Sequence, residues 1–176
     1  IVKLLCLYII SILFFGCASQ GVASGGPADK EGPILVSVTP PNQTLLIGLD
    51  QRIILSFNEL LDPVSIPASI TFAEDYKLKI KGRSIMIVPN NSWSESQILN
   101  IKLSRKIRDY QNNIMAKPIQ LIYCTGTNLP NGYISGHIKG YSFGKIIDVG
   151  LYAWPIHDSS IVIQKVETDE NGFFKF

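Results

Sequence analysis

Two groups of oxygen-bearing side chains have residue types and spacing that could support chemistry. Glu59 and Asp62 are carboxylates three residues apart, and Asp109 is followed closely by Asn112 and Asn113. A carboxylate pair serves in acid–base catalysis only within a cleft that perturbs its pKa values. Calcium takes about six to eight oxygen ligands, more than either group supplies. Because Asp and Asn also form turns, we predict structural roles and no catalytic, cofactor or metal residues, and leave calcium binding open.

The histidines and serines suggest no stronger alternative. Ser135, His157 and Asp158 could be written as a triad, but no G-x-S-x-G motif accompanies them. No Cys/His spacing suits zinc. His137 is expected on an exposed face of a strand, and Cys124 is expected to be a small buried side chain. The sequence therefore predicts a protein that is not an enzyme.

Cys17 is the residue with the clearest chemical expectation. Residues 4–15 are almost wholly apolar, and Lys3 precedes them. This run is shorter than the roughly 20 residues of a membrane-spanning helix, but it matches the apolar core of a secretory signal. Gly16-Cys17 resembles the end of a bacterial lipobox, which implies cleavage before Cys17 and acylation of its thiol. The alternatives are an ordinary secreted protein and an uncleaved anchor.

The residues after Cys17 are consistent with an anchored protein. Residues 17–32 are rich in Gly, Ser, Ala and Pro, which is typical of a flexible tether after a signal at residues 1–16. No aspartate follows Cys17 directly, which favours the outer membrane over the inner. The absence of acidic residues immediately after Cys17 favours the periplasmic face over the cell surface. Membrane lipid is thus the predicted partner of Cys17.

The elements that position these residues are predicted to be strands. Apolar and polar residues alternate through the middle of the chain. Tyr76, Leu78 and Ile80 alternate with lysines, the pattern of a half-buried strand. Similar patterns predict strands at residues 34–40, 52–57, 69–72, 76–82, 84–89, 98–104 and 119–125. About seven short strands separated by turn signals predict an all-β, Ig-like β-sandwich.

The segment "IILSFNELLDPVSI" at residues 53–66 resembles the strand signature of bacterial Ig-like domains of the SbsA or "Big" type. The matching residues are Phe57, Glu59, Leu61, Asp62 and Ser65. The resemblance extends over residues 29–127 and implies a domain at residues 33–127. It implies that Asp62 forms a turn and that Glu59 caps backbone amides. Such domains occur in envelope lipoproteins, notably of Bacteroidota.

A second unit is expected at residues 132–176. The motifs Ile-x-Gly-x-Ile, "VGLY" at residues 149–152 and "TDENGFFKF" at residues 168–176 resemble the start of a carboxypeptidase-regulatory-like, transthyretin-like β-sandwich. The last motif predicts a hairpin in which Gly172 supplies a positive φ. Because the pattern stops in a returning strand, we expect the protein to continue beyond residue 176.

The remaining expectations concern partners. Trp93 and Trp154 are candidate interaction residues, and Trp93 could instead plug the end of the sandwich. Sixteen basic and fourteen acidic residues give a net charge of +2, so no basic footprint for nucleic acid exists. We expect a non-catalytic, lipid-anchored envelope protein that acts as a spacer or binds an envelope protein or glycan. The alternatives are accessory domains of an envelope enzyme whose catalytic part follows residue 176, and a glycan-binding accessory lipoprotein.

Overall fold

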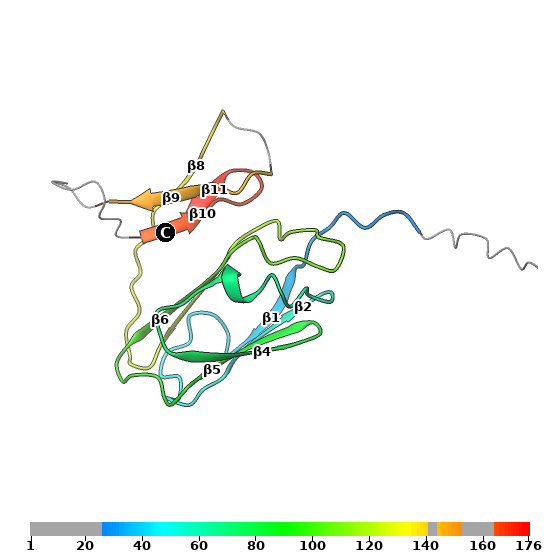
Figure 1. Ribbon diagram of the computed structural model, residues 1–176. Helices are drawn as coiled ribbons and strands as arrows, with labels where there is room; N and C mark the ends of the chain where they lie inside the picture. Colours follow the sequence, from blue (N-terminus) through cyan, green and yellow to red (C-terminus); the bar gives the residue numbers. More distant parts are fainter. Residues whose placement is uncertain (1–25, 141–143, 153–163) are drawn as a thin grey trace, which may run out of the picture.

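The computed structural model describes residues 26–140, 144–152 and 164–176, and within them the chain is all-β (Figure 1). One short 3-10 turn, Pro67–Ser69, interrupts the strands. No helix among the described residues is long and apolar enough to cross a membrane. The strands are β1 Leu35–Thr39, β2 Ile53–Phe57, β3 Ile70–Thr71, β4 Tyr76–Lys81, β5 Ser84–Pro89, β6 Ile98–Leu103, β7 Ile119–Cys124, β8 Ser135–His137, β9 Asp148–Leu151, β10 Gln164–Glu167 and β11 Phe173–Lys175.

The first seven strands form a sandwich of two antiparallel sheets. One sheet has the order β1-β2-β5-β4 and the other β3-β6-β7. This division into four and three strands is that of a constant-type immunoglobulin domain. Each of the seven strands lies within its predicted range or matches it. The predicted all-β, Ig-like β-sandwich is therefore confirmed.

The core lies between the sheets and follows from side-chain alternation. In β2, Ile53, Leu55 and Phe57 are buried while the residues between them are only partly buried. Strand β6 buries every second residue in the same way. The core residues are Ile47, Ile53, Leu55, Phe57, Leu61, Ile66, Ile85, Ile87, Trp93, Leu99, Ile101, Leu103, Ile107, Met115, Leu121 and Tyr123.

The outer edges of the two sheets are protected in different ways. Exposed lysines occupy alternate positions of the edge strand β4, and lysines discourage pairing with another chain. The segment after β1 crosses to the other sheet and covers β7: Gln43 N donates to Ile122 O at 2.9 Å, and Cys124 N donates to Thr44 O at 3.2 Å. This covering segment explains why Cys124 is buried although its neighbour Tyr123 already points into the core.

The tryptophan in the loop after β5 belongs to the core. The side chain of Trp93 is 2% exposed, its Nε1 donates to Gln51 O at 2.8 Å, and its ring meets Phe72 edge-on at 5.6 Å. Of the two interpretations of Trp93, the structure therefore supports the one in which its side chain fills the end of the sandwich. The interpretation of Trp93 as an interaction residue needs correction, because the indole presents almost no surface to a ligand.

The second unit differs from the predicted hairpin. Strand β10 pairs with β9, and β11 pairs with β8, so the strands flanking the turn lie in separate sheets. The turn itself is present, with Gly172 at φ 81°. The carboxylate of Asp169 accepts from the amides of Asn171 and Phe173, both at 2.9 Å. Because this carboxylate takes the Phe173 amide, that N–H does not extend a ladder between β10 and β11.

The burial of Trp93 leads to a prediction about stability. Replacement by alanine removes a fully packed ring and is expected to lower the free energy of unfolding by about 3–5 kcal/mol. Trp93→Phe keeps most of the packing and loses one hydrogen bond, which corresponds to about 1 kcal/mol. Urea denaturation measures both changes. Tyr110→Ala, at an exposed aromatic, is the control. A Trp93→Ala protein as stable as the wild type would contradict the plug.

Candidate functional site

Asp62 lies in a turn that ties the end of the β2 segment to the loop after β6. Its Oδ2 accepts from Arg108 Nε at 2.8 Å, and its Oδ1 accepts from Val64 N at 3.0 Å. The Ser65 hydroxyl donates to Asp62 O at 2.8 Å and accepts from Arg108 N at 3.2 Å. Asp62 N in turn donates to Arg108 O at 2.9 Å. Asp62 therefore forms a turn, as the family resemblance implies.

The ion pair also favours the charged form of Asp62. The hydrogen bond from Arg108 is the main cause that lowers the pKa of the Asp62 carboxyl, and the hydrogen bond from Val64 N acts in the same direction. Because the Asp62 carboxylate is paired with the Arg108 guanidinium, it does not form a carboxylate pair with Glu59. The paired-carboxylate hypothesis for Glu59 and Asp62 thus has no support from the geometry.

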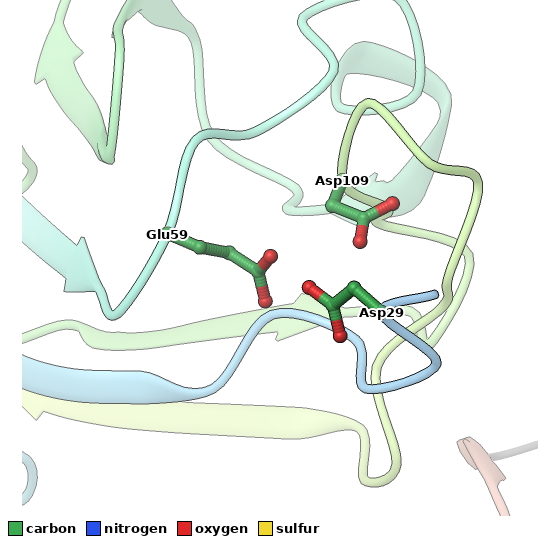
Figure 2. Close-up of side chains that lie close together, drawn as sticks. All are labelled: Asp29, Glu59 and Asp109. Carbon is green, nitrogen blue, oxygen red and sulfur yellow. The ribbon is translucent and has the colours of Figure 1, made fainter. Parts of the chain in front are cut away.

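Glu59 instead lies with two carboxylates from distant parts of the sequence. Figure 2 shows the side chains of Asp29, Glu59 and Asp109 pointing toward one another from three loops. Each residue offers a carboxylate oxygen, and these oxygens lie within 4.8 Å of one another. Asp29 is exposed, Glu59 is partly buried and Asp109 is buried. We call these three residues the acidic cluster.

Asp109 is held in the acidic cluster by its own turn. Its Oδ1 accepts from Asn113 N and its Oδ2 from Asn113 Nδ2, both at 2.8 Å. Asn112 occupies the left-handed region at φ 70°, a conformation that asparagine tolerates. An isolated bridge pairs Asp109 with Leu61. The Asp109–Asn113 loop is therefore a turn stabilised by amides, as its Asx residues predict.

Asp29 reaches the acidic cluster because the segment before β1 packs closely on the same loop. Asn113 Nδ2 donates to Asp29 O at 3.2 Å. A Cβ at Gly32 would lie 2.0 Å from Ile114 O, so the chain passes at a distance that only glycine permits. The Oδ1 of Asp29 accepts from Glu31 N at 3.0 Å. The leading segment is thus part of the folded domain.

The environment of Glu59 disfavours its charged form. Burial is the main cause that raises the pKa of the Glu59 carboxyl, and the charges of Asp109, Asp29 and Glu31 add to it. Arg83 opposes them. Among residues 26–140, 144–152 and 164–176, no backbone amide donates a hydrogen bond to the Glu59 side chain. Within these residues Glu59 lies in the acidic cluster and not in the implied amide-capping role.

A cation is the ligand that the acidic cluster suits chemically, because three carboxylates repel one another without one. Calcium nevertheless takes about six to eight oxygens. The acidic cluster offers one oxygen from each of three residues, and both oxygens of Asp109 already accept hydrogen bonds. The hydrogen bonds around Asp109 and Asp29 explain the arrangement as a junction of three loops, and we assign it no metal.

Of the other sequence-predicted residues, the structure describes His137 and Cys124, which lie in different units. His137 is exposed on β8, with its ring 5.0 Å from that of Phe173. Cys124 is buried, as expected, and Gly126 N donates to its sulfur at 3.2 Å. Cys17, Trp154, His157 and Asp158 lie outside the described residues, so the acylation of Cys17 and an interaction at Trp154 stay predictions.

Sequence analysis missed two residues that the fold makes prominent. Asp29 was assigned to a flexible tether, although a short polar segment with a proline directly before the first strand is a sign of an ordered approach. Arg105 is 2% exposed, which is unusual for an arginine. The available signal was its position two residues after Leu103, where the alternation of buried residues in β6 continues.

The comparison with protein families agrees with this architecture. The family model described as a bacterial Ig-like domain matches residues 29–125. No curated protein matches the chain. Solved structures similar to the chain are an L,D-transpeptidase from Mycobacterium smegmatis (12% identity, TM-score 0.40, 53% of this chain and 40% of that one) and the LD transpeptidase LdtMt1 in complex with imipenem (15%, 0.40, 53% and 40%).

L,D-transpeptidase 3 from Mycobacterium tuberculosis is similar at 12% identity and a TM-score of 0.35, over 52% of this chain and 37% of that one. The chain thus spans 40% or less of the length of these solved structures. Similarity at these scores supports no argument about activity.

The raised pKa of Glu59 leads to a prediction about its charge. Because the pKa is raised above 4.5 in the folded state, ionised Glu59 lowers stability at neutral pH. Glu59→Gln is expected to raise the free energy of unfolding at pH 7 by roughly 0.5 kcal/mol, since solvent screens this group. The gain should disappear only well below the ordinary pKa of glutamate, at about pH 3, where the carboxyl is protonated in both states. Urea denaturation at both pH values measures it, with exposed Glu95→Gln as the control. A loss of stability at pH 7 would contradict the prediction.

Asp62 is expected to have the opposite dependence on pH. Its pKa lies below 3.8 in the folded state, so its contribution is present above that value and is lost as pH falls through the folded pKa. Asp62→Asn should therefore lower Tm at pH 7 and show a smaller decline in Tm on acidification than the wild type. Thermal unfolding from pH 7 to pH 2 measures this difference. Exposed Asp50→Asn should leave the acid decline as in the wild type; an Asp62→Asn curve parallel to the wild type would count against the ion pair.

Proposed function

The chain belongs to the bacterial Ig-like domain family, matched over residues 29–125, and from this premise we propose that it is a non-catalytic, lipid-anchored envelope protein. In this proposal the Ig-like domain is a structural spacer or a protein-interaction module. Residues 132–176 begin a carboxypeptidase-regulatory-like domain, and the protein sits at the outer membrane on its periplasmic face. The envelope of a Bacteroidota-type bacterium is the setting that the resemblance implies.

The observation that carries this proposal is the order of segments in the sequence. An apolar run ends at Gly16-Cys17, and the family match begins at residue 29. Acyl chains on Cys17 would contribute about 0.8 kcal/mol for each buried CH₂, so two or more chains make a stable anchor. A folded domain placed so close to the anchor suits a protein that holds other groups near the membrane.

The roles of the described polar residues support a non-catalytic function. Asp62 is paired with Arg108, and Asp109 accepts two hydrogen bonds from Asn113. Cys124 is buried, and His137 lies on an exposed strand. A catalytic group must reach its substrate and hold a suitable pKa. Asp62 and Asp109 stabilise turns instead.

Two rival functions differ from this proposal in what they require. A glycan-binding accessory lipoprotein requires exposed aromatic rings, and the burial of Trp93 removes one of the two candidates. Accessory domains of an envelope enzyme require a catalytic domain after residue 176, and the sequence of the complete gene decides that point. Fluorescence titration with glycans tests the first rival through Trp154, because the buried Trp93 is not expected to respond.

The lipid anchor is the part of the proposal to test first. Intact mass of the membrane-extracted protein is expected to exceed the mass of the chain from Cys17 onward by a diacyl or triacyl adduct. Cys17→Ala should lose the adduct and leave the membrane fraction. Cys124→Ala is the matched control, since Cys124 is buried, and should keep the adduct. An unmodified wild-type protein in the medium would overturn the lipid-anchored proposal.

A further inference from the structure

The linker between the two units cannot by itself fix how they are arranged. Residues 128–134 have no regular secondary structure, and most of them are exposed. A polar linker that contains Gly and no regular structure lets two domains move independently, which is the default expectation for neighbouring domains. In Figure 1 the second unit nonetheless lies against one end of the sandwich, near the loops that follow β6. Contacts other than the linker must hold it there.

Four hydrogen bonds join the two units within the described residues. Lys102 Nζ donates to Lys165 O at 2.7 Å, and Arg105 N donates to Glu167 Oε2 at 2.9 Å. Arg105 Nη1 donates to Lys145 O at 3.4 Å, and Glu170 N donates to Ala116 O at 2.9 Å. The residues that are joined lie far apart in the sequence, so these bonds form a contact between folded units. We call this contact the joint.

Arg105 occupies the centre of the joint. Its Nε donates to Met115 O at 3.0 Å inside the Ig-like domain, while its backbone amide and Nη1 bond to the second unit. A buried guanidinium is costly unless carbonyls and negative charges surround it. Glu167 supplies a carboxylate to the backbone amide of Arg105, and the Lys145 carbonyl accepts from its guanidinium. The second unit therefore provides, through Lys145 O, part of what stabilises this buried cation.

The pairing of β10 with β9 places Glu167 unfavourably. In the ladder between β10 and β9, Glu167 lies directly opposite Asp148. Like charges at directly opposed positions destabilise an antiparallel pair. The bond to the Arg105 amide is an evident compensation for this arrangement.

The turn after Glu167 is also buried at the joint. Thr168 and Asp169 are buried although they belong to a turn, where polar residues are normally exposed. Glu170 has an exposed side chain, yet its amide bonds to Ala116 O across the joint. Burial also lowers the pKa of Lys102, which bonds to the second unit. Lys102 is thus desolvated where it bonds to the second unit.

We propose that the joint locks the Ig-like domain and the second unit into one rigid body, with the Glu167 carboxylate and the Arg105 amide as the bond that keeps it closed. The proposal concerns the relation of the two units and is independent of the lipid anchor. Its consequence is that the second unit projects from the Ig-like domain in a set direction.

Hydrogen exchange of the full chain in detergent, resolved to single amides, tests this proposal. In the wild type the Glu170 amide is expected to be protected, because its acceptor is Ala116 O on the other unit. Glu167→Ala removes a charge-assisted hydrogen bond and is expected to speed Glu170 exchange about tenfold. The amides of Leu55 and Ile101 in the core should keep their wild-type protection and show that the sandwich is folded.

Asp148→Ala is the matched control. It removes the like charge opposite Glu167 without touching Arg105, so it should not speed Glu170 exchange. Where the alanine variant does not fold, Glu167→Gln keeps an acceptor oxygen and should speed exchange by about threefold, because a neutral acceptor is weaker. A wild-type Glu170 amide that exchanges like a free amide would overturn the proposal, as would a folded Glu167 variant with wild-type protection at Glu170.

Discussion

The burial of alternate side chains on two facing sheets is the constraint on which the rest of the structure depends. Ile53, Leu55 and Phe57 on β2 face Leu99 and Ile101 of the opposite sheet across the core. A slip of one residue in any strand would turn this apolar set toward water. The register is therefore strongly specified, and with it the place where each strand ends and each loop begins.

Polar chemistry is confined to the loops that this register positions. The loops after β2 and β6 meet at one end, where Asp62 pairs with Arg108 and Asp109 folds its own turn. Like-charged Glu59 and Asp109 are brought together there because the sheets fix where their loops begin. Burial raises the pKa of the Glu59 carboxyl, and the charge of Asp109 adds to this effect. The stability of the core thus supports an arrangement of charges that would not form by itself.

Different parts of the structure were predictable to different degrees, and the range of the interactions explains why. The strands and the Asp62 turn depend on neighbouring residues, so period-2 alternation and a local motif were sufficient. The acidic cluster joins Asp29, Glu59 and Asp109 from three separate loops, and no local signal pairs them. The predicted pairing of the two strands around Gly172 was wrong for the same reason. The turn is a local feature, whereas β10 pairs with β9 and β11 pairs with β8.

The sequence by itself determined the all-β class and the seven strands of the sandwich, because each strand follows from residues close together along the chain. The acylation of Cys17 stays a prediction from the same kind of local pattern. Only the tertiary structure decided that Trp93 is buried, that Asp29 belongs to the folded domain, and that Arg105 lies at the contact between two units. These outcomes depend on which loops the packed sheets bring within hydrogen-bonding distance. That distance is a property of the folded chain, since the residues concerned are separated by tens of positions in sequence.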